Sequence, residues 1–339
     1  IRFALKKRSP FQDSFRGFYM ADLTSSYPKK TATNKPGGGR FRMSGVQWRQ
    51  TKTFASAFLF LSPSIVLFLA FVFIPLIRTV ILSTYLTDPI GRPSVFAGLL
   101  QYQRLFGSSS TFVNSFSRSL LFVLYTVPTS MLLSLGLALL GNLRLKAISL
   151  FRIFFSSTIA VSGATASLMF LYLFHPTIGS FNYFLSLLHI PEVPWLTSEV
   201  TALPAISMVT IWLQLGLNTV VLLAAMQNIP EEIYESAMID GANSWNKFTH
   251  ITLPFLSSTF FFLLIVDMLA AFQTFTPVQV MTSGGPLDST NLLVYSIFRE
   301  FYINGKYGFA AAQSIMLFLI MLILTIFQFV FVERKVFYE

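Results

Sequence analysis

A polar segment between two long apolar runs carries the clearest local signal in the sequence. It covers residues 228–250. Asn228 can cap the N-terminus of a short helix, with Glu231 three residues later to complete a capping box and Pro230 in the first turn. Gly241 can end that helix because glycine adopts a positive φ readily. The pattern predicts a short helix that projects from the membrane and stops at this glycine.

A second short helix is expected directly after Gly241. Asn243 or Ser244 can cap it, and it leads into the next apolar run at Leu253 and Pro254. The whole segment is thus predicted to be a helix–Gly–helix unit. The alternative is an ordinary amphipathic loop that lies on the membrane surface.

These residues resemble the signature loop of the permeases of ABC importers. In that loop a Glu-Ala-Ala triplet is followed after three residues by Gly, and after nine more by Ile-x-Leu-Pro. This chain departs only in having Ser236 for the first Ala, and the matching residues are Glu235, Ala237, Gly241, Ile251, Leu253 and Pro254. The resemblance implies that residues 231–244 form a coupling helix that docks in a groove of an ATPase subunit. The implied coupling residues further include Glu231, Glu232 and Asp240.

Two further stretches resemble the carbohydrate-uptake branch of that family, specifically its first permease of the maltose and glycerol-phosphate type. One is residues 281–290, and the other is residues 307–314 at the start of the last apolar run. The first stretch contains the turn residues Gly284, Gly285 and Pro286. The resemblance covers residues 56–339. It implies a permease subunit of a sugar importer in the cytoplasmic membrane of a prokaryote.

Polar residues recur at helical spacing inside one of the apolar runs. They lie three or four residues apart and therefore on one face of a helix, and they are Ser207, Thr210, Gln214 and Asn218. Polar groups in hydrocarbon are unfavourable without partners, so this face should contact protein or water. It could contact the hydroxyl groups of a transported sugar or form hydrogen bonds to a neighbouring helix. A weaker stripe of the same kind is formed by Thr158, Ser162 and Thr165.

Asp267 is the single acidic residue deep in a predicted span, and Thr274 lies seven residues later on the same face. A carboxylate at the centre of a membrane helix costs about 2.5–3.5 kcal/mol on insertion scales, so a compensating partner is expected. We expect a structural carboxylate or one that lines the substrate path. A proton relay is the alternative, but no second intramembrane acid or histidine accompanies Asp267.

The composition indicates that lipid surrounds these elements. Hydrophobic residues make up 54% of the 339 residues, aromatic residues 16%, and the mean hydropathy is +0.65, which is more apolar surface than one soluble domain could bury. Runs of about 20 apolar residues, the length that crosses a ~30 Å hydrocarbon core, predict an all-α integral membrane protein with six transmembrane helices. The expected spans are 56–82, 119–140, 150–174, 202–226, 254–276 and 309–332.

The net charge of +10 is concentrated at the N-terminus. Residues 1–53 contain twelve Lys or Arg against Asp13 and Asp22, and the rest of the chain is neutral. A basic arm beside an apolar body indicates the cytoplasmic face of a membrane rather than a nucleic-acid surface. The arm is expected to be largely disordered, and residues 54–339 to form the permease domain. The positive-inside rule then places both termini in the cytoplasm, with the loop 228–250 between the fourth and fifth spans facing inward.

The sequence excludes several kinds of chemistry. It has no cysteine, and its three histidines lack metal-ligand spacing, so neither a thiolate nucleophile nor a metal site is expected. It also lacks a Gly-x-x-x-x-Gly-Lys-Ser/Thr motif. We therefore expect a non-catalytic subunit that binds no cofactor. The resemblance implies that separate ATPase subunits use ATP and Mg.

The same resemblance implies four kinds of partner. These are a second permease subunit that forms a heterodimer with this chain, two ATP-binding subunits, an extracytoplasmic solute-binding protein and membrane lipid. A non-sugar solute such as glycerol phosphate is an alternative. A secondary transporter would leave the loop at 228–250 unexplained, and an intramembrane enzyme would need a catalytic constellation that the spans do not contain.

Overall fold

The computed structural model describes residues 58–107, 111–143 and 145–333. The chain divides into two compact units, residues 1–65 and 66–339. In the first unit residues 58–65 are helical. The basic arm predicted for residues 1–53 lies outside the described residues, and its expected disorder stays a prediction.

The second unit is built almost wholly of helices, and its elements follow in this order: η1 (Leu69–Phe73), α3 (Ile74–Ser83), β1 (Tyr85–Thr87), β2 (Pro93–Phe96), α4 (Leu100–Leu105), α5 (Thr111–Gly141), α6 (Ile148–Ser156), η2 (Ser157–Ala160), α7 (Gly163–Leu173), α8 (Ser180–Leu187), α9 (Ala202–Gln227), α10 (Glu231–Ile239), α11 (Ser244–Lys247), η3 (Phe248–Thr252), α12 (Leu253–Phe255), α13 (Ser257–Phe272), α14 (Thr276–Met281), α15 (Leu293–Phe298), η4 (Arg299–Ile303), α16 (Tyr307–Phe327) and η5 (Gln328–Val332). The two strands form an antiparallel hairpin in which Tyr85 pairs with Phe96.

Five helices of the described residues are long and apolar enough to cross a membrane, or six if one bent pair counts as a span. The five are Phe58–Ser83, Thr111–Gly141, Ala202–Gln227, Ser257–Met281 and Tyr307–Val332. This confirms an all-α membrane protein. The second span begins at Thr111 rather than near residue 119, because its first turns have neighbours to pack on: Phe112 is buried with Leu105 and Leu293.

The third span is predicted as one continuous helix over 150–174, but the structure has two helices in this region. Helices Ile148–Ala160 and Gly163–Leu173 meet at an angle of 106°. Val161 and Ser162 have extended backbones at the junction, and the Ser162 side chain accepts a hydrogen bond from the N–H of Thr165. Ser162 therefore starts a new helix as its N-cap, a position where serine is strongly favoured. The predicted stripe through Thr158, Ser162 and Thr165 does not form one continuous face.

The centre of the second unit is the contact between α5, α9 and α13. Buried residues from these helices, including Phe122, Ile206 and Phe272, form one apolar cluster with α14 and α15. On its other side α9 approaches the bent pair very closely at Gly216. A Cβ atom added there would overlap the Thr158 hydroxyl and lie 2.9 Å from a side-chain carbon of Ile159. Glycine is thus required for this helix contact.

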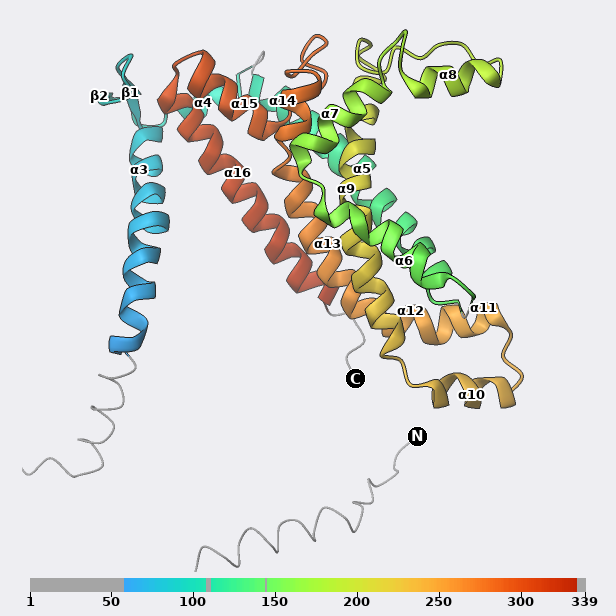
Figure 1. Cartoon of the computed structure of the whole chain (residues 1–339). Coiled ribbons are helices and arrows are strands. Elements are labelled where there is room, and N and C mark those ends of the chain that lie inside the picture. The colour runs from blue at the N-terminus through green and yellow to red at the C-terminus, as the bar shows by residue number, and fades with distance from the viewer. Residues whose placement is uncertain (1–57, 108–110, 144, 334–339) are drawn as a thin grey trace, which may run out of the picture. The chain divides into compact units, whose positions relative to one another are not determined.

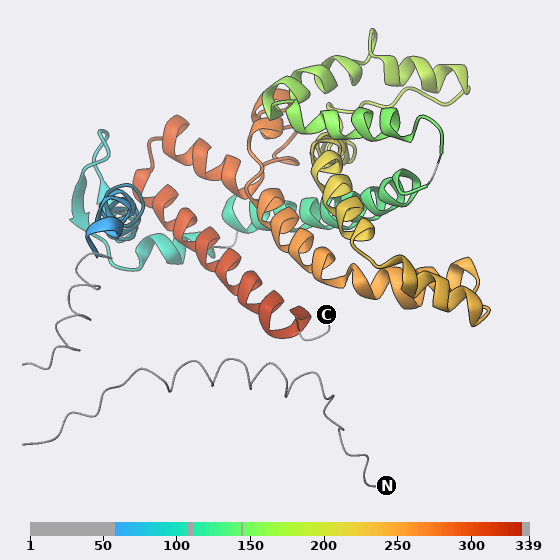
Figure 2. The same ribbon diagram turned by 60° about the horizontal axis from the view of Figure 1, so that its bottom comes forward.

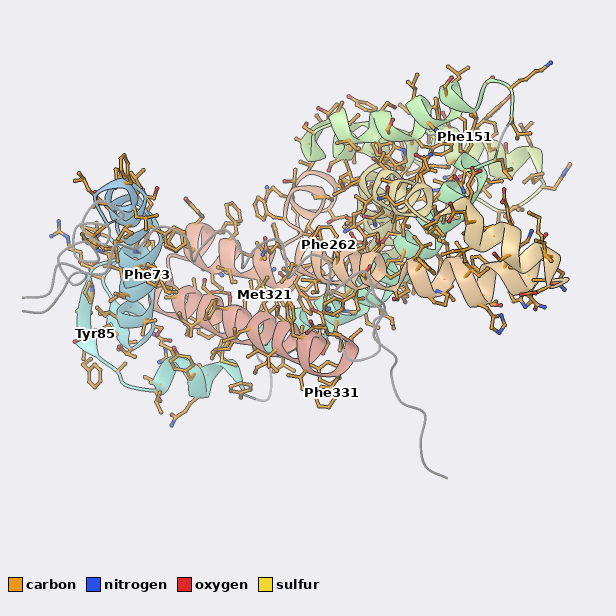
Figure 3. All side chains as sticks on the ribbon, turned by 90° about the horizontal axis from the view of Figure 1, so that it is seen from below. Phe73, Tyr85, Phe151, Phe262, Met321 and Phe331 are labelled. Atoms are coloured by element: carbon orange, nitrogen blue, oxygen red, sulfur yellow. The ribbon has the colours of Figure 1, made fainter. Side chains whose placement is uncertain are left out.

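The elements gather at two opposite ends of the spans. Figures 1 and 2 show α10 and α11 at one end, away from α7 and α8, and Figure 1 places α4, α14 and α15 at the same end as α7. Side chains such as Phe262 and Phe331 project from the outer surfaces of α13 and η5, where they are exposed (Figure 3). Apolar side chains on such surfaces are suited to contact with lipid or with another membrane subunit.

Candidate functional site

The predicted helix–Gly–helix unit is present between the long helices α9 and α13. Helix α10 carries Glu231 and Glu232 in its first turn, where carboxylates interact favourably with the helix dipole. Gly241 has a φ of +79°, and a Cβ there would meet nothing within 4 Å in the part of the chain that the structure describes. Asn243 caps α11 by accepting a 2.8 Å hydrogen bond from the N–H of Asn246. Gly241 is therefore required for its backbone conformation and leaves open space beside it.

The predicted capping of α10 by Asn228 is wrong. Asn228 is the C-cap of the preceding helix α9, with φ −83° and ψ −10°, and its N–H donates a hydrogen bond to the carbonyl of Ala225. Pro230 occupies the N-cap position of α10 instead, with an extended ψ of 132°. The reason is that α9 continues through Gln227, so the chain turns only at Ile229 and Pro230 before α10 can begin.

Two large apolar side chains stand exposed on the helix–Gly–helix unit. Ile239, at the end of α10, is 88% exposed, and Trp245 of α11 is 69% exposed. Both lie close to Gly241 in the chain, and the carboxylates of Glu231, Glu232 and Glu235 are exposed as well. Such a surface, apolar with acidic neighbours, is typical of a protein contact. The sequence prediction missed Ile239 and Trp245, although bulky apolar residues in a polar loop are a usable signal.

The remaining signature residues connect the unit to the membrane helices. Tyr234 of α10 forms a 2.8 Å hydrogen bond to the hydroxyl of Thr252, which is buried at the end of η3. The turns through Ile251, Leu253 and Pro254 then lead into α13. Beside this contact lies a cavity of about 800 Å³ whose wall includes Arg152. That arginine donates a 2.9 Å hydrogen bond to the carbonyl of Gly141 at the end of α5.

A second group of polar residues is buried between the long spans. Asp267 of α13 is 2% exposed, and its Oδ2 accepts a 2.6 Å hydrogen bond from Nδ2 of Asn218 on α9. The same oxygen accepts a 3.1 Å hydrogen bond from the hydroxyl of Ser130 on α5. We call these three residues the polar cluster. The compensating partner expected for Asp267 is thus present, and Ser130 is the member that the sequence prediction missed.

The other predicted substrate-path residues form no hydrogen bond to Asp267 in the described part of the chain. Ser207 and Thr210 donate to backbone carbonyls four residues earlier on α9, and Thr274 does the same on its own helix. Gln214 is different: among the described residues neither its amide nitrogen nor its oxygen has a hydrogen-bond partner, although both atoms are buried. The Oδ1 atom of Asn218 is buried without a partner in the described structure as well. These unpartnered atoms are where a polar ligand or water would be accepted most readily.

The turn at Gly284, Gly285 and Pro286 is held tightly at the opposite end of the spans. Gly284 has a φ of +84°, and a Cβ there would lie 2.6 Å from the ring of Tyr295. Asp288 in the same loop forms a salt bridge with Arg299, which follows α15. The hydrogen bond that Arg299 donates to Asp288 raises the pKa of the arginine above its ordinary value. The loop therefore has a defined shape in spite of its glycines.

Metal chemistry finds no support in the described residues, where no group of three or more His, Asp or Glu side chains could hold an ion.

The sequence was compared with known families and proteins. Residues 94–337 match the family described as "Binding-protein-dependent transport system inner membrane component". The chain belongs to this family. It is therefore a multi-pass component of a binding-protein-dependent transporter, and the resemblance to ABC-importer permeases is confirmed.

Relatives of this family member include the sn-glycerol-3-phosphate transport system permease protein UgpA of Pectobacterium atrosepticum. The two are 35% identical over 255 residues, which are 74% of this chain and 85% of the relative. The protein of the same name from Agrobacterium fabrum is 33% identical over 282 residues, or 83% and 96% of the two chains.

A chain of a bacterial alginate ABC transporter, solved in complex with an alginate pentasaccharide-bound periplasmic protein, has a similar structure. The TM-score is 0.72 at 22% identity, and the match covers 83% of this chain and 95% of that one. At this identity the similarity establishes the fold.

Proposed function

We propose that this permease forms one half of the translocation pathway of an ATP-driven importer, and that α10, Gly241 and α11 couple it to an ATPase subunit. The observation that supports coupling most strongly is the exposed helix–Gly–helix unit at the end of the bundle. It combines exposed apolar residues with exposed carboxylates, and the bond between Tyr234 and Thr252 links it to the start of α13. Movement of an attached subunit would be transmitted to that helix.

In this proposal the bent pair counts as the third of six spans, and both termini lie in the cytoplasm. Successive spans would cross the membrane in opposite directions, which brings α10, α11 and the end of η5 to the same side of it. Figure 1 supports this topology, because these elements lie at the same end of the long helices. The excess of Lys and Arg in the arm 1–53 assigns that face to the cytoplasm. The outward face then carries α7, α8 and the turn at Gly284.

We place the substrate path beside the polar cluster and Gln214. A sugar or polyol has many hydroxyl groups that both donate and accept hydrogen bonds, and the buried Gln214 amide and Asn218 Oδ1 offer both functions. The names of the relatives support a solute of this class, since one group is named for sn-glycerol-3-phosphate and the similar structure was solved with an alginate oligosaccharide. Glycerol phosphate is the second candidate, favoured by the UgpA relatives.

The partners follow from the same proposal. Two ATP-binding subunits would supply ATP and Mg chemistry, a second permease would complete the path as a heterodimer, and an extracytoplasmic binding protein would deliver the solute. This chain itself binds no cofactor in the proposal. Closure of the ATPase subunits would move the coupling units together and open the path outward, as in alternating access. A secondary transporter would have no use for the exposed unit around Gly241.

The test is to replace Gly241 by Asp in the complete transporter and to measure co-purified ATPase and solute uptake together. A side chain at a φ of +79° is strained by about 1–2 kcal/mol, and the new charge would alter the docking surface. We expect normal membrane insertion, with loss of the ATPase or ATP hydrolysis without uptake.

The matched control is Gly98→Asp, because Gly98 also has a positive φ, of +55°, but lies in the segment between β2 and α4. Its uptake should stay close to that of the wild type. Normal uptake and normal ATPase content in Gly241→Asp membranes would refute the coupling role.

A further inference from the structure

A cavity of about 320 Å³ lies between β1, α4 and the first turn of α16, at the end of the bundle opposite α10 and α11 (Figure 1). Its wall includes Gln101 and Arg104 from α4, together with Gly305, Lys306, Gly308 and Phe309 at the start of α16. None of these residues belongs to the coupling unit, the polar cluster or the turn at Gly284. The cavity is thus a separate feature of the fold.

The first turn of α16 supplies one set of donors to this cavity. The first N–H groups of a helix have no intrahelical acceptor, and within the described chain no side chain caps α16 at Lys306. A helix of this length also presents a partial positive charge at this end. Gly308 lets this turn lie close to Tyr85 and Gln101. A Cβ atom there would overlap the carbonyl of Tyr85 and lie 3.1 Å from Nε2 of Gln101. The amide of Gln101 therefore faces this first turn.

Gln101 supplies the observation that points to a ligand. It is 3% exposed, and its Nε2 reaches the Tyr85 carbonyl only at 3.5 Å. Its Oε1 is buried, and no donor in the described part of the protein bonds to it. A buried acceptor without a partner is unfavourable, so a ligand that offers an O–H or N–H here would remove that cost.

The charges at the mouth favour an anion. Among the described residues no carboxylate lies within ion-pair distance of Arg104. Lys306 is paired at 3.3 Å with Glu300, whose side chain is almost fully buried. Two cations and one carboxylate leave a net charge of +1, to which the start of α16 adds its partial positive charge.

We propose that this cavity binds a phosphate ester whose neighbouring group carries a hydroxyl or a protonated amine. The phosphate would lie on Arg104, Lys306 and the first N–H groups of α16, and the neighbouring donor would bond to Oε1 of Gln101. A glycerophosphoryl group has this chemistry. It could come from a phospholipid headgroup or from free glycerol phosphate.

The position of the cavity suits a headgroup. It lies at the ends of two candidate spans, Phe58–Ser83 and Tyr307–Val332, which is the depth of lipid phosphates. Below it, Ile77 and Val80 of α3 and Leu319 of α16 are exposed apolar side chains that acyl chains could cover. The proposal goes beyond the transport role and does not depend on which solute is imported.

The experiment uses the full chain purified in detergent and measures binding by the shift of its unfolding temperature. Three probes are titrated: short-chain phosphatidylglycerol, which has hydroxyl donors; short-chain phosphatidylcholine, whose quaternary ammonium has none; and free glycerol phosphate. The variants are Arg104→Gln and Gln101→Leu. Arg92→Gln is the matched control, because Arg92 is an exposed arginine in the turn between β1 and β2 and lies outside the cavity wall.

We expect saturable binding of phosphatidylglycerol that Arg104→Gln weakens about tenfold, the effect of losing one charge-assisted hydrogen bond. Gln101→Leu should weaken phosphatidylglycerol but not phosphatidylcholine, and Arg92→Gln should change neither. Equal affinity for free glycerol phosphate would identify the soluble ester as the ligand, and affinity for the lipid alone would identify the headgroup.

Two results would overturn the proposal. One is the absence of saturable binding by any of the three probes. The other is equal weakening in Arg104→Gln and Arg92→Gln, because that pattern describes general surface charge rather than a site. If Gln101→Leu lowers the unfolding temperature without ligand, Arg104→Gln still decides the question, since Arg104 is exposed and its replacement leaves no cavity.

Discussion

Asn218 donates a 2.6 Å hydrogen bond to Asp267, and this contact joins two long helices across 49 residues of sequence. Both side chains are buried, so neither has bulk water as an alternative partner. Polar groups in a membrane protein find partners mostly on neighbouring helices, where each bond contributes about 0.6 kcal/mol on average and up to about 1.7 kcal/mol. The two residues are therefore expected to behave as one energetic unit.

The first prediction tests this coupling by a double-mutant cycle. Asn218→Leu and Asp267→Leu should each destabilise the protein, and the double variant should be less destabilised than the sum of the two by about 0.6–1.7 kcal/mol. Unfolding in detergent, followed by temperature, measures the effect. Ser207→Ala is the control, because among the described residues its hydroxyl bonds only to the carbonyl of Leu203 on the same helix, and its cycle with Asp267→Leu should show no coupling.

The second prediction separates the substrate path from packing. Gln214→Leu removes two buried atoms that have no partner among the described residues, so it should leave stability unchanged or raise it. If Gln214 contacts the solute, uptake should nevertheless fall while assembly and ATP hydrolysis persist. A variant that transports as well as the wild type would place Gln214 outside the path.

The third prediction ranks the residues of the coupling unit. Trp245→Ala should weaken ATPase binding by about 2 kcal/mol or more, because exposed aromatic side chains often dominate a protein interface. Glu235→Ala should have a smaller effect of about 0–1 kcal/mol, typical of exposed charge pairs. Pull-down of the ATPase over a concentration series gives both values. A larger loss in Glu235→Ala than in Trp245→Ala would contradict the ranking.

The fourth prediction concerns the contact between α9 and the bent pair. Gly216→Ala should lower the unfolding temperature, because the new methyl group would overlap the Thr158 hydroxyl. Gly136→Ala is the control: Gly136 also lies within a long helix, but a Cβ there meets no described atom within 4 Å. That variant should be neutral or stabilised by up to about 1 kcal/mol through helix propensity.

Features encoded within a few residues were predicted well. The positive φ of Gly241 and the capping of α11 by Asn243 depend on local backbone chemistry, and both are present. The apolar runs likewise located the long spans, because their length is set by the membrane. The early start of α5 at Thr111 could not be read in this way, since its first turns are stabilised by distant residues such as Leu293.

Features that depend on two segments together were missed. Ser130 gave no signal as a partner of Asp267, because 137 residues separate them and serine is common in membrane helices. The bend at Ser162 was hidden because the run 150–174 contains several serines and threonines, and a serine there is equally compatible with a helix interior and with an N-cap. The prediction for Asn228 failed for the opposite reason: its capping pattern was suitable, but α9 extends through Gln227 and Asn228 serves as its C-cap.

The bend between Ile148–Ala160 and Gly163–Leu173 also has a consequence for biogenesis. Each half of this bent pair is shorter than the roughly 20 residues that cross a bilayer alone. The surface that packs on the first half, at Gly216, belongs to a helix that is translated later. During synthesis the third segment thus reaches the translocon before its partner exists, and its final bent geometry can be fixed only after the fourth segment has entered the bilayer.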